Sequence, residues 1–228
     1  MYIAEQQLIA AAVGLRARGW NAFGSTFAAF LRARYDFVRM AAISRVNLRL
    51  SQARTPVFSI GEDGPSQMAP ERHRLTPGDS LELVLHPCDA NQTARSSSPR
   101  WRTRKASCSF ARCGPEHAGH LRLRTKSSEV GGSKVIRSSE NDNVTIVGIG
   151  VTVHEALGSR SNARRGGNQR TRVIDAYSVA SRSTRTPLQA ASEATGRIIT
   201  VEGPFPRGRA RRMQCWPRSQ RRTSTARC

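Results

Sequence analysis

Basic residues in this chain are concentrated in a few segments, and this uneven distribution limits what the chain can fold into. Of the 37 Lys and Arg residues, 24 fall within residues 95–128, 158–172, 180–186 and 204–228, where Glu116 is the only acid. Ordering these segments would cost conformational entropy that their few large apolar side chains could not offset. We therefore expect residues 95–128, 158–171 and 204–228 to be irregular.

Two interpretations of the formal net charge of +21 stay open. In one, the tail at 204–228 binds polyanions, and the chain is an Arg-rich nucleic-acid-binding protein. Phe205 and Trp216 are too few aromatic residues in that tail for a base-stacking platform. In the other, the basic segments are the translation of a frameshifted gene, because Arg-, Ser- and Pro-rich text without apolar periodicity alternates with segments of ordinary enzyme composition. The gene's nucleotide sequence would decide between them.

Hydrophobic patterns between the basic segments predict an α/β fold. Apolar residues at helical spacing predict helices over residues 4–17 and 26–44, and Gly19 is expected to end the first. Thr152 is a candidate cap for a further helix, but residues 158–171 have no apolar face, so we expect that helix to be broken. The alternation of strands and helices implies a parallel sheet. Strands are predicted over residues 81–85, 144–147, 172–177 and 197–201, and a helix remnant over residues 190–195.

Seven short motifs follow one another along the chain. They are Ile3–Gln7, Gly24–Phe30, Gly61–Ala69, Pro87–Asn91, Gly131–Val135, Val151–Leu157 and Gly196–Glu202. In this order they resemble transketolases, which use thiamine diphosphate to move two-carbon ketol units between sugar phosphates in the pentose phosphate pathway. The resemblance implies a parallel-sheet pyrimidine-binding domain over residues 1–128. A partial three-strand α/β C-terminal domain would follow over residues 129–203, and then a basic tail over residues 204–228.

The resemblance also implies which side chains would hold the cofactor. Glu5 would be the catalytic carboxylate that hydrogen-bonds N1′ of the aminopyrimidine ring, because a carboxylate in a dry pocket can share a proton with a weakly basic nitrogen. Phe27 and Phe30 would stack on that ring, since flat apolar faces hold a flat ring at little entropic cost. Without the resemblance, Glu5 is better explained as an exposed first-turn helix glutamate, and the two phenylalanines as core residues on one helix face that need no ligand.

Substrate and partner residues follow from the same resemblance. Asp63 would contact a hydroxyl of the donor sugar, Gln67 would lie beside the substrate channel, and Arg124 would bind the substrate phosphate. The family usually has a donor-orienting histidine upstream of Asp63, but residues 51–58 contain none. The Gly-Asp-Gly…Asn motif that binds the diphosphate and its Mg²⁺ or Ca²⁺ is also missing from these 228 residues. We expect a separate subunit to bind the diphosphate and the metal ion, and we expect the chain without such a partner to be an incomplete, inactive fragment.

Targeting and metal signals are weak. The sequence has no charged leader before an apolar run and no apolar stretch near 18 residues, so we expect a cytoplasmic chain without a membrane span. Five cysteines at irregular spacing give no disulfide framework. Four residues of metal-ligand type are too closely spaced for a zinc finger, and we expect no metal there. They are Cys108, Cys113, His117 and His120.

Overall fold

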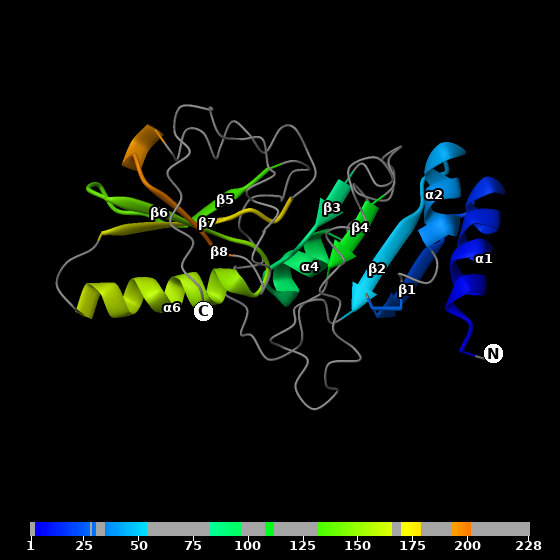
Figure 1. Cartoon of the computed structure of the whole chain (residues 1–228), viewed down its shortest axis with the longest axis horizontal. Helices are drawn as coiled ribbons and strands as arrows, with labels where there is room; N and C mark the ends of the chain where they lie inside the picture. Colours follow the sequence, from blue (N-terminus) through cyan, green and yellow to red (C-terminus); the bar gives the residue numbers. More distant parts are fainter. Residues whose placement is uncertain are drawn as a thin grey trace.

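The described part of the chain forms two four-stranded sheets with helices packed on them (Figure 1). The structure is a computed structural model. It describes residues 3–27, 29–30, 35–53, 83–96, 108–111, 132–165, 170–178 and 193–201. No helix in these ranges is both long and apolar enough to span a bilayer.

The first sheet is parallel throughout, with strand order β1-β2-β4-β3. Its strands are β1 (Phe23–Phe27), β2 (Arg49–Ala53), β3 (Leu83–Leu85) and β4 (Cys108–Ala111). Its helices are α1 (Glu5–Ala17), α2 (Tyr35–Ile43) and α4 (Ala90–Ser96). Helix α2 connects the neighbouring parallel strands β1 and β2, and α4 connects β3 and β4, which is the arrangement parallel strands require.

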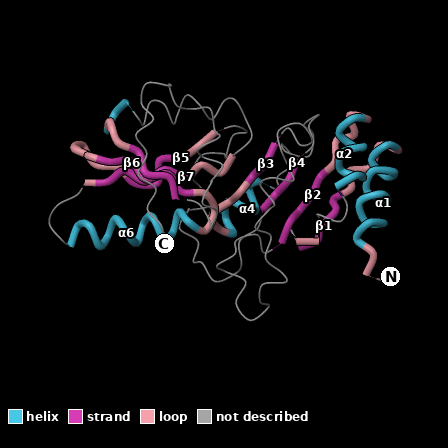
Figure 2. Tube along the Cα trace, viewed as in Figure 1, coloured by secondary structure: helices cyan, strands magenta, loops and turns pink. Residues whose placement is uncertain are grey.

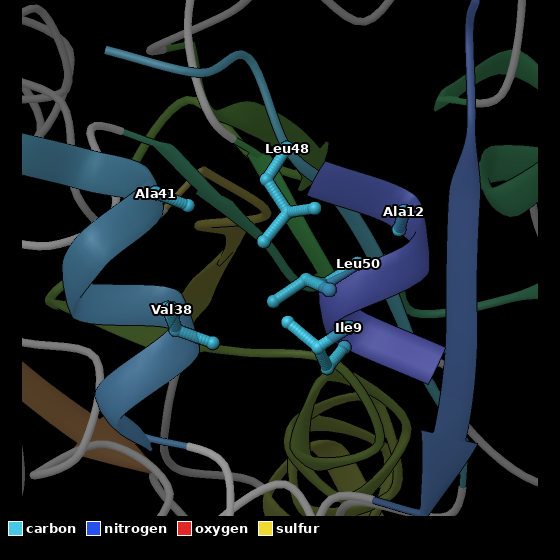
Figure 3. Packing of buried hydrophobic residues seen from close by; sticks show 6 residues of the cluster. All are labelled: Ile9, Ala12, Val38, Ala41, Leu48 and Leu50. Carbon is cyan, nitrogen blue, oxygen red and sulfur yellow. The ribbon is translucent and has the colours of Figure 1, made fainter. Parts of the chain in front are cut away.

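Helices α1 and α2 pack against the sheet through one apolar cluster (Figure 3). Its buried members are Ile9, Ala12, Val38, Ala41, Leu48 and Leu50. The helix can approach the strand closely because Gly24 of β1 has no side chain. A Cβ at Gly24 would lie 3.3 Å from Cδ1 of Ile9 and 3.5 Å from Cδ2 of Leu50. Burying a side chain of this size contributes about 1.5–3 kcal/mol, so the cluster fixes α1 on β1.

The helix predicted over residues 4–17 is confirmed as α1. It ends as predicted at Gly19, whose φ of 89° lies in the left-handed region. There the Gly19 N–H donates to the Arg16 carbonyl at 3.0 Å and the Trp20 N–H to the Leu15 carbonyl at 3.1 Å. These two bonds form a Schellman motif, which satisfies carbonyls at the end of the helix.

The second sheet is mixed, with order β5-β7-β6-β8. Its strands are β5 (Lys134–Arg137), β6 (Val144–Gly148), β7 (Thr171–Asp175) and β8 (Ile198–Val201). Strands β6, β7 and β8 are parallel, while β5 pairs antiparallel with β7. Helix α6 (Thr152–Arg165) connects β6 to β7 and packs along them (Figure 2). The predicted strands over 144–147, 172–177 and 197–201 are thus confirmed within one or two residues.

The prediction of one helix over residues 26–44 is wrong in its first half. Phe27 belongs to strand β1, and the helix begins at Tyr35. The three-residue spacing of Phe27 and Phe30 is typical of a helix face, but Phe30 lies in a turn after the strand. Pairing with β2 overrides the weak local preference of a segment that contains Gly24 and Ser25. The predicted strand over 81–85 is confirmed for its last three residues, β3.

Three further sequence predictions need correction. Residues 158–165 are helical and complete α6, so the crossover is not broken there. Its first two turns bury Val153 and Ala156, and that packing supports the helical turns that follow. Residues 95–128 are not wholly irregular, because Cys108–Ala111 form β4 between β2 and β3. The second domain has four strands rather than three, since β5 was not predicted. Residues 204–228 lie outside the described ranges.

The turn between β6 and α6 shows why a glycine stands at residue 148. A Cβ there would lie 2.9 Å from both N and Cα of Val153, so the helix backbone rests directly on the strand. Thr152 is the first residue of α6, and its hydroxyl accepts from the Ile149 N–H at 2.9 Å and donates to the Val201 carbonyl at 2.7 Å. It therefore ties the helix start to β8. The turn over residues 148–150 therefore serves packing.

We predict that alanine has opposite effects on stability at Gly148, the last residue of β6, and at Gly158, within α6. Gly148→Ala should lower the free energy of unfolding by about 1–3 kcal/mol, because the backbone of Val153 must move. Gly158→Ala is the matched control: nothing lies within 4 Å of its Cβ position, so it should raise stability by up to about 1 kcal/mol through helix propensity. Urea unfolding of both variants measures the difference. Equal effects would contradict the close packing of α6 on β6.

Candidate functional site

The carboxyl edge of the first sheet carries the aromatic residues that the sequence singled out. Strands β1 and β2 are parallel, with Phe27 opposite Ala53, so both strands end at the same edge. In open α/β sheets, ligands bind outside the carboxyl ends of the strands. Phe27 is the last residue of β1 and Phe30 follows it in a turn, where the Phe30 N–H donates to the Phe27 carbonyl at 3.1 Å.

The two phenylalanine rings meet edge to face. Their centroids lie 5.8 Å apart with an interplanar angle of 81°, and both side chains are half-buried. This is a favourable aromatic geometry, worth about 0.5–1.5 kcal/mol beyond the burial of the rings. The pair therefore gives the sheet edge a fixed, partly exposed apolar surface that suits a flat ring.

Glu5 lies at the same end of the sheet. It is the first residue of α1, and a short connection turns the chain from the end of α1 into β1. The helix consequently runs opposite to the strand, and its first turn lies toward the carboxyl end of β1, near the chain's N-terminus (Figure 1). The Glu5 side chain is half-buried, and a carboxylate in the first turn is favoured by the helix dipole. The fold thus brings Glu5, Phe27 and Phe30 to one end of one domain.

The substrate residues implied by the sequence lie elsewhere in the chain. Asp63, Gln67 and Arg124 fall outside the described residues. The chain leaves β2 at Ala53, so Asp63 and Gln67 follow in sequence from the carboxyl edge that carries Phe27. The segment 51–58, where the resemblance expects a histidine, begins inside β2.

The described residues hold no cluster of three His, Cys, Asp or Glu side chains able to bind a metal ion. Of the four closely spaced metal-ligand types, Cys108 alone is described, as the first residue of β4. This end of the sheet accordingly offers a carboxylate at the start of α1 and two aromatic rings at the end of β1. Those groups fit an aminopyrimidine ring, which is flat and has a weakly basic nitrogen.

A set of buried polar side chains lies at the junction of the two domains, and the sequence alone did not predict it. Asp89 directly precedes α4, Gln92 lies in its first turn, and Asp175 is the last residue of β7. Gln92 is hydrogen-bonded to both aspartates. Pro87–Asn91 is one of the motifs that carry the resemblance. Spacing along the chain, however, cannot show that Gln92 meets a residue 83 positions away.

This geometry defines the class of protein: two α/β domains in sequence, the first with a carboxylate and two aromatic rings at the carboxyl edge of its sheet. The family model described as "Transketolase, pyrimidine binding domain" matches residues 1–118, and "Transketolase, C-terminal domain" matches residues 133–209. The chain belongs to the transketolase family. The second match includes the basic segment 158–172.

Curated relatives are similar along most of this chain. Transketolase-like protein 1 of Bos taurus is 38% identical over 208 residues, which cover 91% of this chain and 34% of that protein. Transketolase of Homo sapiens is 36% identical over 208 residues, with 91% and 33% covered. The chain therefore spans about a third of the length of the curated relatives it matches.

Solved structures share the fold. A split-gene transketolase, described as an inactive β4 tetramer, superposes with a TM-score of 0.75 at 25% identity, covering 89% of this chain and 63% of that chain. Transketolase from Leishmania mexicana superposes with a TM-score of 0.71 at 21% identity, covering 89% and 30%. Each of the two superpositions covers 89% of this chain.

Proposed function

We propose that this chain supplies the pyrimidine-binding half of a transketolase active site. The reaction would transfer a two-carbon ketol unit from a ketose phosphate to an aldose phosphate, as in the pentose phosphate pathway of the cytoplasm. The observation that carries the proposal is the meeting of Phe27 and Phe30, 5.8 Å apart, at the carboxyl end of β1 in a domain of this family. When bound, thiamine diphosphate supplies the reactive carbon that carries the ketol unit.

The chain's own residues would bind and orient the cofactor's pyrimidine ring. Glu5 would hold a proton at ring atom N1′, and Phe27 and Phe30 would hold the ring's apolar faces and exclude water. In a dry site a hydrogen bond to a carboxylate is stronger than in water. By the same resemblance, Asp63 and Gln67 would contact the donor sugar, and Arg124 its phosphate.

A second polypeptide would supply the diphosphate and metal site. The 228 residues contain no Gly-Asp-Gly…Asn motif, and Mg²⁺ or Ca²⁺ would be bound through that partner. The similar split-gene transketolase supports such a division, because its chain forms an inactive β4 tetramer. A homo-oligomer of this chain alone would be inactive for the same reason. The matches end at residue 118 and resume at residue 133, which supports a domain boundary near residues 128–129.

We predict that the isolated chain is inactive. Purified alone, with thiamine diphosphate and Mg²⁺, it should show no ketol transfer between ketose and aldose phosphates. The physical reason is that half of the cofactor site and the donor-orienting histidine are missing from these residues. A coupled spectrophotometric assay measures this. Turnover by the chain alone, as monomer or homo-oligomer, would contradict the two-part site.

We expect Glu5 to be needed for turnover in an active pair with a diphosphate-binding polypeptide. Glu5→Gln should lower turnover by about 10²–10⁴-fold while the pair still assembles, because an amide cannot share a proton with N1′ as a carboxylate does. Glu155→Gln is the matched control, since Glu155 is an exposed first-turn glutamate of α6 in the other domain. Unchanged activity of the Glu5 variant would refute the role of Glu5.

A further inference from the structure

One buried carboxyl group joins the two domains. Asp175 ends β7 in the second sheet and is fully buried. Its Oδ2 accepts a hydrogen bond at 2.7 Å from Nε2 of Gln92, a fully buried residue of α4 in the first domain. A buried side-chain bond between sequence positions this far apart ties α4 to the end of β7.

Gln92 is held in place by the loop that precedes it. Its Oε1 accepts from the Cys88 N–H at 2.6 Å, and its own N–H donates to Oδ1 of Asp89 at 2.7 Å. The Gln92 side-chain amide therefore accepts a hydrogen bond from its own domain and donates one to the other domain. A change in Asp175 therefore reaches the loop at residues 86–89 through Gln92.

Other bonds at the junction run through the backbone. The His86 N–H donates to the Tyr177 carbonyl at 2.7 Å, and Leu85 and Ser178 form an antiparallel bridge. Nε2 of His154, on α6, lies 2.7 Å from the Cys88 carbonyl oxygen. The segment after β7 thus pairs with the end of β3. The loop at residues 86–89 contacts both that segment and α6.

The carboxyl group of Asp175 is poorly solvated for a charge. Its Oδ1 has no hydrogen-bond partner among the described residues. Burial raises the pKa of Asp175 from 3.8 to about 7, although hydrogen bonds from Gln92 and Cys88 and the charge of Lys134 lower it. Lys134 lies opposite Asp175 in the β5–β7 pair. The nearby carboxylate of Asp89 raises the pKa further, and the titratable His86 and His154 lie at the same junction.

We propose that the Asp175 carboxyl is a proton-operated latch between the two domains, closed when the group is protonated and loosened when it ionises. In the protonated form, Oδ2 accepts the Gln92 bond and no charge is buried. In the ionised form, the junction holds a charge with one oxygen unpartnered, and opening the junction to water relieves that cost.

The direction of the pH effect follows from the raised pKa. Below about pH 4 the carboxyl is protonated in both the closed and the open junction, so the closed form has its full stability. As the pH rises from about 4 to about 7, opening releases a proton, and the closed form loses stability. Above about pH 7 the carboxyl is ionised in both forms, and the dependence levels off.

Amide hydrogen exchange of the full chain at several values from pH 5 to 8.5 tests the latch. The readout is exchange in residues 86–92, normalised to β2 amides at each pH to remove the chemical pH dependence. The opening equilibrium should rise by up to about tenfold per pH unit between pH 5 and 7, relative to Asp175→Asn, and then level off. Asp175→Asn can accept the Gln92 bond but cannot ionise, so any pH dependence that does not come from Asp175 is common to both chains and cancels.

A second buried acid gives the control. Asp142 accepts from the Ser139 N–H at 2.8 Å and lies 3.7 Å from Nε of Arg172, away from the junction. Asp142→Asn should keep the wild-type pH dependence in residues 86–92. The same slope in wild type and Asp175→Asn would overturn the latch. If Asp175→Asn does not fold, the aspartate ¹³C carboxyl signals of the wild-type chain decide: one should titrate near pH 7, and titration of all of them below about pH 5 would overturn it.

Discussion

The packing of Ile9 onto Gly24 and Leu50 is the contact on which the first domain depends. The Cβ position of Gly24 lies 3.3 Å from the Ile9 side chain, so a side chain at residue 24 would force Ile9 to shift. The position of α1 in turn decides where its first residue, Glu5, stands relative to the end of β1. The apolar contact of Ile9 (Figure 3) therefore helps to determine where Glu5, the first residue of the same helix, lies.

Different kinds of contact stabilise the interior of each domain and the junction between the two domains. Each domain has its own apolar core: Ile9 and Leu50 in the first, and Val147 and Ile174 in the second. The junction combines a small apolar contact, around Cys88 and Val153, with buried polar bonds and backbone pairing. Apolar packing responds little to pH, whereas a buried carboxyl responds strongly. Protonation can therefore affect the junction without disturbing either core.

The sequence predicted the parts of the fold whose patterns are local. The apolar face of residues 4–17 and the strand at 144–147 contain their own signals, and both were confirmed. Strand β4 and strand β1 were missed because four or five residues show no clear period, and their pairing partners decide their structure. Helix α6 was underestimated because a helix needs apolar contacts on only part of its length to form.

The candidate site could be predicted only through resemblance. Glu5, Phe27 and Phe30 are spread over 26 positions, and no spacing rule shows that a helix start and a strand end share one edge. The fold brings them to that edge, while Gln92 and Asp175 meet through tertiary packing that no motif encodes.

Calorimetric titration of thiamine diphosphate and Mg²⁺ tests the central claim most directly. It would use this chain, a diphosphate-binding polypeptide and their mixture, with Phe27→Leu/Phe30→Leu as variant and Phe37→Leu as control. We expect tight binding by the mixture, weakened in the double variant but not in the control. Binding by the mixture that equals binding by the other polypeptide alone would contradict the account.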